Sequence, residues 1–241
     1  LVTAIMQKNT SMKVKTFTIG FDSDKYNEAN YAKKVSNYLN TDHTEYMCTS
    51  KDALDLLPLL PDVLDEPMAD SSIIPTLVVS KLTKENVTVS LSADGGDELF
   101  AGYNVYAKII KLNQLLKRIP FKKGQSRLIR SISRKIAQNN YRLSNRLNRI
   151  SHLLSADNLI DRFNSISNGF TPSMCESLLL APPHFNQNDL EVYKSLGLGF
   201  NEIDTLLSKD FQTSHIDQLL VKVDRATMHY SLEGREPLLD H

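Results

Sequence analysis

Hydrophobic and polar positions follow two alternating periods over the first hundred residues of the chain. Apolar residues at helical spacing open the chain and recur at about 27–39, 50–60 and 71–84. Runs rich in β-branched and aromatic residues lie between these helices, at 14–21, 43–48 and 87–92. Strands that alternate with helices indicate βαβ units, so we expect an α/β fold whose parallel sheet is covered on both faces.

The pattern changes beyond about residue 104, where helices predominate and no convincing strand is evident. Between Glu98 and Asp157 the chain carries 13 Lys and Arg residues and no acid. Such a block can be a footprint for nucleic acid, but the apolar residues within it, including Leu128 and Ile132, favour amphipathic helices with basic exposed faces. We therefore predict an α/β core over residues 1–103 and a mostly α-helical part over 104–241.

Composition places the chain among ordinary globular proteins. It has 241 residues, of which 41% are hydrophobic and 23% charged, and its net charge is zero. The zero balance disfavours binding to nucleic acid or to a membrane surface. No apolar run is long enough to span a membrane, and no signal peptide is visible. Two cysteines, Cys48 and Cys175, make no disulfide framework, so we expect a cytoplasmic protein in which both are small buried or half-buried residues.

The two ends of the chain are abrupt. Leu1 stands directly in an apolar helical pattern with no capping residue before it, and the sequence stops at His241 without a polar tail. We therefore expect the chain to be a fragment of a longer protein.

The most informative segment is the loop that follows the strand at 87–92. Gly95 and Gly96 allow backbone N–H groups to approach an anion, and three carboxylates, on Asp94, Asp97 and Glu98, lie within five positions. Acids beside a phosphate site imply a bridging divalent cation. The loop thus indicates a nucleotide-metal site at the carboxyl end of a strand. A Gly-Gly turn followed by an acidic helix N-terminus explains the same residues and stays open.

Two further charged segments have both a structural and a functional interpretation. The run from Asp65 to Ser72 could face a substrate or metal, but a serine that caps the following helix explains it better. Charged residues near the end, over 222–225 and 233–237, are typical of surface ion pairs. The six histidines show no metal-binding spacing.

Taken together, four segments resemble the synthetase domain of glutamine-dependent asparagine synthases. They are Phe-Thr-Ile-Gly-Phe at 17–21, Asp-Glu-Pro-Met-Ala-Asp at 65–70, Leu-Ser-Ala-Asp-Gly-Gly-Asp-Glu-Leu-Phe-Ala-Gly-Tyr at 91–103, and the stretch from Val223 to Asp240. Each segment alone is a weak signal, whereas their order and spacing together are specific. The resemblance covers the first hundred and the last thirty residues and is vaguer in the basic middle.

The resemblance implies a pyrophosphatase-type, adenine nucleotide alpha hydrolase-like fold. It also implies that ATP activates a carboxylate as an acyl-adenylate and that ammonia then forms the amide. By matching position, Ile19 would touch the adenine region, Ser92 and Ala93 would contact the nucleotide with Gly95 and Gly96, and Asp97 would bind Mg²⁺. The catalytic positions implied are Asp94, Asp224, Arg225, Glu233 and Arg235.

The chain also departs from the family pattern. The family's phosphate loop, Ser-Gly-Gly-x-Asp-Ser-Ser, and its first strand would precede Leu1, and the glutaminase domain that supplies ammonia is absent, as is a lysine that the family carries beyond this chain's end. Ala93 stands where glycine is usual, which restricts φ. We therefore expect this chain to be inactive alone.

The resemblance implies aspartate, ATP and ammonia as partners and leaves a homodimer open. Alternatives are the amidation of another carboxylate, such as a sugar-linked one, and a noncatalytic binding module of the same fold. An RNA-contacting basic module at 104–150 is the reading that the neutral net charge favours least.

Overall fold

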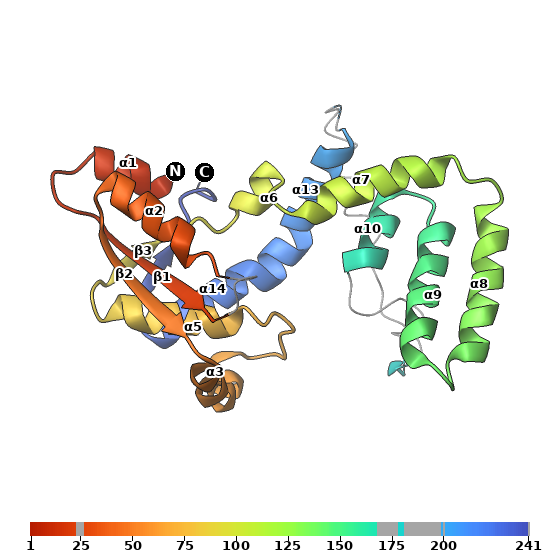
Figure 1. The fold of residues 1–241 in the computed structure, drawn as a ribbon, viewed down its shortest axis with the longest axis horizontal. Helices are drawn as coiled ribbons and strands as arrows, with labels where there is room; N and C mark the ends of the chain where they lie inside the picture. The colour runs from red at the N-terminus through yellow and green to blue at the C-terminus, as the bar shows by residue number, and fades with distance from the viewer. Residues whose placement is uncertain (23–26, 168–177, 181–198, 200, 241) are drawn as a thin grey trace. The chain divides into compact units, whose positions relative to one another are not determined.

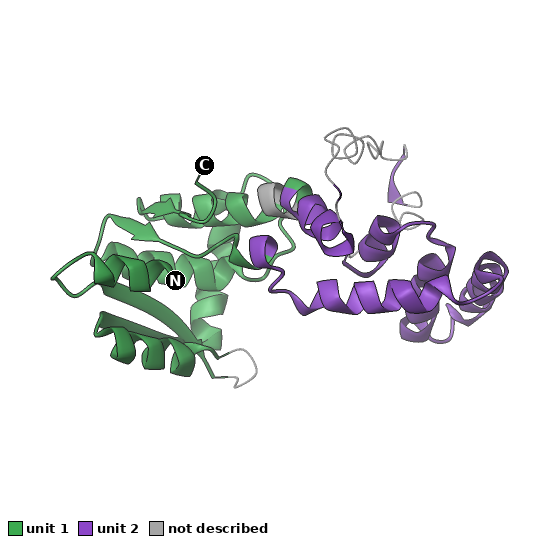
Figure 2. Cartoon of the chain, turned by 90° about the horizontal axis from the view of Figure 1, so that it is seen from above, with its two compact units in different colours: residues 1–97, 212–241 green, residues 98–211 purple. Residues whose placement is uncertain are grey.

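The computed structural model describes residues 1–22, 27–167, 178–180, 199 and 201–240 (Figure 1). The chain divides into two compact units (Figure 2). Unit 1 comprises residues 1–97 and 212–241, and unit 2 comprises residues 98–211. The last thirty residues therefore belong to the same compact unit as the first ninety-seven.

Unit 1 combines helices with short parallel strands. Its first part contains α1 (Val2–Lys8), β1 (Lys15–Phe21), α2 (Ala29–Leu39), β2 (Asp42–Cys48), α3 (Ser50–Leu56), the 3₁₀ helix η1 (Leu57–Leu59), α4 (Leu60–Val63), α5 (Ile73–Lys84) and β3 (Val89–Leu91). Its second part contains α14 (Val221–His229) and β4 (Glu233–Arg235). Two elements cross the unit boundary, α6 (Gly96–Phe100) and the π-helical segment η3 (Phe211–Leu220).

The described strands pair in parallel, as expected for an α/β fold. β1 pairs with β2 over their whole length, and β3 pairs with β4. The pairs form two separate two-stranded sheets within the described residues. The β4 strand corrects the expectation that no strand follows residue 104, because three residues are too few to show a strand period.

Both α2 and α5 pack against β1. A side chain has little room at Gly20, because a Cβ there would lie 2.5 Å from Met47 Sδ on β2 and 3.2 Å from Ala29 Cβ on α2. On α5, Ile73 and Leu77 are four residues apart and therefore share one face. They meet Val63 and Ala226 in the core of unit 1.

Unit 2 is helical, as predicted for the basic stretch of the sequence. Its described helices are α7 (Asn104–Lys117), α8 (Lys122–Ile136), α9 (Tyr141–Ser155), α10 (Leu159–Ser167) and α13 (Glu202–Asp210). Tyr106 and Ile109 of α7 form its core with Phe163 and Leu206. None of the helices in the described part of the chain is both long and apolar enough to cross a membrane.

The α8–α9 hairpin is held together by small polar residues. Ser126 Oγ donates to the Ser151 carbonyl at 2.7 Å. Ser133 Oγ donates to the Ser144 carbonyl at 2.8 Å, and Ser144 Oγ donates back to the Ser133 carbonyl at 2.9 Å. Small side chains let the two helices approach closely, and the hydrogen bonds satisfy the buried hydroxyls.

Cys48 is buried with a free thiol, as expected of a small core residue. Cys175 lies outside the described residues.

Enlarging a serine in this hairpin should destabilise unit 2 more than removing its hydroxyl. We expect Ser133→Ala to lower the free energy of unfolding by about 1 kcal/mol through the lost hydrogen bond. Ser133→Leu should lower it by up to about 3 kcal/mol, because the larger side chain must separate the helices. Urea unfolding followed by circular dichroism measures both effects. Ser131→Leu, at an exposed position of the same helix, is the matched control, and an equal loss in both leucine variants would contradict close packing at Ser133.

Candidate functional site

The β3–β4 pair brings two distant segments of the sequence to one edge. Because the strands are parallel, their carboxyl ends lie side by side. The Ser92 N–H extends the ladder by donating to the Arg235 carbonyl at 3.0 Å. The loop after β3 and Glu236, which follows β4, therefore begin at the same edge of this sheet. Open α/β sheets bind their ligands at this kind of edge.

The loop after β3 is fixed by its own hydrogen bonds. Ser92 Oγ donates to Asp94 Oδ2 at 2.7 Å, and the Asp94 N–H donates to Ser92 Oγ at 3.2 Å. The Gly96 N–H donates to the Ala93 carbonyl at 3.1 Å and closes the turn that leads into α6. This N–H is therefore engaged within the loop.

Gly95 meets two separate requirements for glycine. Its φ of 85° lies in the left-handed region that side chains disfavour. A Cβ at this position would also lie 2.4 Å from Leu239 Cδ2. Packing of Leu239 against the loop therefore explains the first glycine of the motif without reference to a ligand.

The carboxylate of Glu236 lies within electrostatic range of two acids from other segments. Burial raises the pKa of the Glu236 carboxyl, and the negative charges of Asp94 and then Asp224 raise it further. Asp94 is in the loop after β3, Asp224 is on α14 and Glu236 follows β4. The structure thus brings together two of the predicted acids and adds Glu236, which the sequence analysis missed. Its place beside Arg235 in the family-like segment was the available signal.

The other two acids of the loop differ in their surroundings. Asp97 is exposed and makes no hydrogen bond or ion pair with the described residues. Glu98 belongs to unit 2, where it is buried and accepts a hydrogen bond from the Tyr103 hydroxyl at 2.8 Å. Of the two, Asp97 has the carboxylate that is open to a ligand.

The predicted basic residues are paired with acids on the surface. Arg225 on α14 forms an ion pair with Asp65. Arg235 Nε donates to Glu233 Oε1 at 2.7 Å, and both side chains are more than half exposed. Ile19 lies half-buried on β1 in the other sheet. Within the described residues, no hydrogen bond or ion pair joins these side chains to Asp94, Asp224 or Glu236.

A buried lysine that the sequence analysis did not single out ties α14 to the acidic segment before α5. Lys222 is only 7% exposed, and its Nζ donates to Asp70 Oδ2 at 3.1 Å and to Ser72 Oγ at 2.8 Å. Burial acts to raise the pKa of the Asp70 carboxyl, but hydrogen bonds from Ser72 and the Lys222 ammonium outweigh it and hold that pKa below its usual value.

These contacts also correct the expected cap of α5. Ser72 occupies the N-cap position, but its side chain makes no capping hydrogen bond. The hydroxyl instead donates to Asp70 Oδ1 at 2.7 Å and accepts from Lys222. The Ser72 side chain therefore joins the hydrogen bonds between Asp70 and Lys222 and does not cap the helix.

The carboxylates at this edge suit a cation that is coordinated in part by water and phosphate oxygens. The described residues contain no group of three or more His, Cys, Asp or Glu side chains that could hold a metal ion by themselves. Mg²⁺ in nucleotide sites commonly takes only one or two protein carboxylates and completes its shell with water and phosphate oxygens. The exposed carboxylate of Asp97 fits this partial role.

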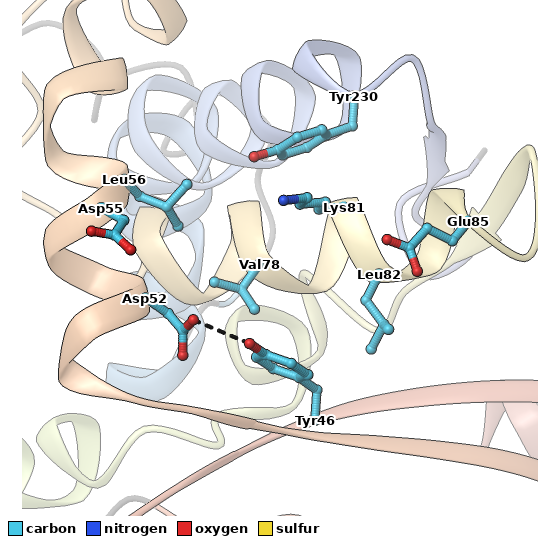
Figure 3. A pocket seen from close by; sticks show the side chains of 9 residues that line it. All are labelled: Tyr46, Asp52, Asp55, Leu56, Val78, Lys81, Leu82, Glu85 and Tyr230. Carbon is cyan, nitrogen blue, oxygen red and sulfur yellow. Dashed lines mark hydrogen bonds between the residues drawn. The ribbon is translucent and has the colours of Figure 1, made fainter.

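A separate cavity of about 350 Å³ lies elsewhere in unit 1 (Figure 3). It is lined by Tyr46, Asp52, Asp55, Leu56, Val78, Lys81, Leu82, Glu85 and Tyr230. None of these residues was predicted as a site residue, and none belongs to the loop after β3.

Comparison with known proteins identifies relatives over the whole chain. Glutamine-hydrolysing asparagine synthetase 1 of Bacillus subtilis is 30% identical over 232 residues, which cover 94% of this chain and 35% of that protein. A putative glutamine-hydrolysing asparagine synthetase of Mycobacterium bovis is 28% identical over 230 residues, covering 93% and 33%. A second putative synthetase, from Methanocaldococcus jannaschii, is 37% identical over 120 residues, covering 49% and 23%.

The chain thus spans about a third of the length of the relatives that it matches over nearly all its residues. The family model for asparagine synthase matches residues 1–241. The parallel strands and surrounding helices agree with the α/β, adenine nucleotide alpha hydrolase-like fold that the sequence predicts. With its motifs, fold and full-length match in agreement, the chain belongs to the asparagine synthase family.

Proposed function

We propose that this chain is the nucleotide-binding part of an ATP-dependent ligase that converts a carboxylate, with aspartate as acceptor, into an amide. The observation that carries the proposal is the acidic loop at the carboxyl end of β3, within a chain that matches the asparagine synthase family throughout. The relatives are named glutamine-hydrolysing asparagine synthetases, which supports glutamine as the source of ammonia and aspartate as the acceptor.

The reaction has two steps. A carboxylate oxygen of the acceptor attacks the α-phosphorus of ATP, and pyrophosphate leaves. Ammonia, released from glutamine by a glutaminase domain of the parent protein, then attacks the acyl carbon, loses a proton and displaces AMP. The protein's task is to hold the reactants in line and to stabilise the charge that develops on the phosphates.

The nucleotide would lie against the end of β3. The Ser92 N–H is already bonded to Arg235, so contacts to the nucleotide from this residue fall to its carbonyl group. Ala93 would add backbone contacts, and Ile19 would pack against the adenine. Gly95 and Gly96 keep side chains away from this part of the loop.

Asp97 would contribute the protein's carboxylate to Mg²⁺. When bound, this ion neutralises phosphate charge and so favours departure of pyrophosphate. The exposure of Asp97 and its lack of a partner in the described residues support this role, because the carboxylate needs no rearrangement to become a ligand.

The two arginines would bind anionic groups of the substrates. Arg225 and Arg235 are held by Asp65 and Glu233 in exposed ion pairs. Exposed pairs of this kind contribute at most about 1 kcal/mol, so a phosphate or carboxylate can replace the acidic partner at little cost. We assign both arginines, together with Glu233, to the substrate cleft on this basis.

The group of Asp94, Asp224 and Glu236 is an electrostatic indication of a site at this edge. Burial and the negative charges of Asp94 and Asp224 raise the pKa of Glu236, and proteins concentrate groups perturbed in this way at functional sites. We propose that Asp94 and Asp224 act in forming or using the adenylate and that Glu236 belongs to the same group.

The isolated 241-residue chain should not turn over. The 241 residues do not contain the Ser-Gly-Gly-x-Asp-Ser-Ser phosphate loop that the family resemblance implies, so the ATP phosphates would be held weakly. We expect no steady release of pyrophosphate from the chain mixed with Mg-ATP, aspartate and ammonia, measured with a coupled pyrophosphate assay. Sustained release above the rate of a heat-unfolded control would contradict this expectation.

In the parent protein, Asp97→Asn should lower Mg-ATP-dependent amide formation by at least about a hundredfold, because a neutral amide is a poor ligand for Mg²⁺. Asparagine formation at saturating ammonia measures the effect without the glutaminase step. Asp62→Asn makes the same change at an exposed position of α4 and should leave the rate unaltered. Unchanged activity of Asp97→Asn would remove Asp97 from the metal site.

Neutralising Glu236 should stabilise the chain at neutral pH. Because the pKa of this carboxyl is raised in the folded state, ionisation opposes folding, and stability is lost as the pH rises through that pKa. Glu236→Gln should therefore unfold at a higher urea concentration than the unaltered chain at about pH 7, and the difference should disappear below the ordinary pKa of 4.5.

Glu45→Gln, on the exposed side of β2, is the matched control for this pH series. A difference between Glu236→Gln and the unaltered chain that stayed constant with pH would show that charge repulsion is not its cause.

A further inference from the structure

The cavity shown in Figure 3 has the size and composition of a small-molecule site. It lies between β2, α3, α5 and the residue that follows α14, and its volume of about 350 Å³ is within the range of ligand pockets. Its walls combine aliphatic side chains with two tyrosines and four charged groups. The inference drawn from it is independent of the proposed ligase function.

One of the charged groups is already committed to the protein. Asp52 Oδ1 accepts a hydrogen bond from the Tyr46 hydroxyl at 3.1 Å, and Oδ2 accepts from the N–H and hydroxyl of Thr49 at 2.8 and 2.6 Å. The Thr49 hydrogen bonds lower the pKa of the Asp52 carboxyl, and the Tyr46 bond adds to this effect. Asp52 is therefore an ionised, fixed part of the wall that holds the Tyr46 ring.

The other three charged groups are uncommitted. Lys81, Asp55 and Glu85 line the cavity but form no hydrogen bond or ion pair with the residues that the structure describes. Lys81 in α5 and Glu85, the residue that follows this helix, are four positions apart, a spacing at which such residues can pair, and they form no ion pair. One ammonium and two carboxylates are thus open to a ligand.

The space between these charges is apolar. Leu56 of α3 and Val78 and Leu82 of α5 supply aliphatic surface, and the half-buried Tyr230 ring closes another side. A ligand that complements this arrangement has one anionic group, two cationic groups and a short hydrocarbon chain between them.

We propose that this cavity binds a basic α-amino acid, such as arginine, lysine or ornithine. The carboxylate of the ligand pairs with Lys81, and its α-ammonium and side-chain cation pair with Asp55 and Glu85. The methylene groups of the ligand lie against Leu56, Val78 and Leu82. The charge of the ligand then opposes that of the wall, which carries one cation and three carboxylates when Asp52 is included.

Calorimetric titration of the 241-residue chain at low salt tests the proposal with matched probes. We expect saturable binding of L-arginine, at least about fivefold weaker binding of agmatine, which lacks the carboxylate, and similarly weak binding of L-norvaline, which lacks the side-chain cation. Added salt should weaken the binding of L-arginine, because the contacts are ionic and partly exposed. Absence of saturable binding by arginine, lysine and ornithine would overturn the proposal.

Single substitutions test which group of the ligand each of the three charged side chains binds. Lys81→Met should abolish the preference for L-arginine over agmatine, whereas Asp55→Asn and Glu85→Gln should each weaken L-arginine by about fivefold. Lys33→Met and Asp62→Asn make equivalent changes at exposed positions outside the cavity and should have no effect. Urea unfolding confirms that each variant is folded. A preference for L-arginine that survived Lys81→Met would overturn the assigned orientation.

Discussion

The return of residues 212–241 to the first unit is the constraint on which the candidate site depends. Residues 98–211 separate this segment from the strand that it joins, so the pairing of β4 with β3 closes a long loop at an entropic cost. Burial of Ala226 against α4 and α5 offsets part of that cost. The ion pair between buried Lys222 and half-buried Asp70 holds α14 in place, because an unpaired ammonium in that position would be strongly unfavourable. Without this closure, neither Asp224 nor Glu236 would be near Asp94.

Local pattern predicted the elements of the fold better than their contacts. The β-rich run at 14–21 and the helical spacing at 71–84 correspond to β1 and α5. The period of apolar residues that predicts such an element depends only on residues close in sequence. The α8–α9 hairpin shows where prediction from local pattern fails. Its apolar residues predicted amphipathic helices correctly, yet Leu128 is 64% exposed while Ser133 is buried at the helix contact. Which face a helix buries depends on the partner, and a serine that bonds across the contact gives no hydropathy signal.

The candidate site was predictable to the extent that it is local in sequence. The glycines and acids of the loop after β3 were recognisable in the sequence, and Asp97 is exposed, as a residue that coordinates a metal ion must be. Glu236 and Lys222 were missed because their significance arises only when α14 and β4 return to the loop and to Asp70. Such tertiary contacts leave no trace in the spacing of residues along the chain. Ser72 shows the opposite case. The sequence has the pattern of a helix cap, but the Ser72 hydroxyl accepts a hydrogen bond from the distant Lys222 instead.

The loop after β3 also illustrates how structure and ligand binding can make the same demand on a residue. Gly95 has a left-handed backbone that Leu239 packs against, and the Ser92–Asp94 hydrogen bonds fix the preceding residues. Contacts within the chain thus hold the loop in its conformation. A site formed in this way loses little conformational entropy when a nucleotide binds, so more of the binding energy remains available for positioning the reactants. The fold alone therefore accounts for Gly95, and the functional indication of the loop comes from its acids and from its place at the carboxyl end of β3.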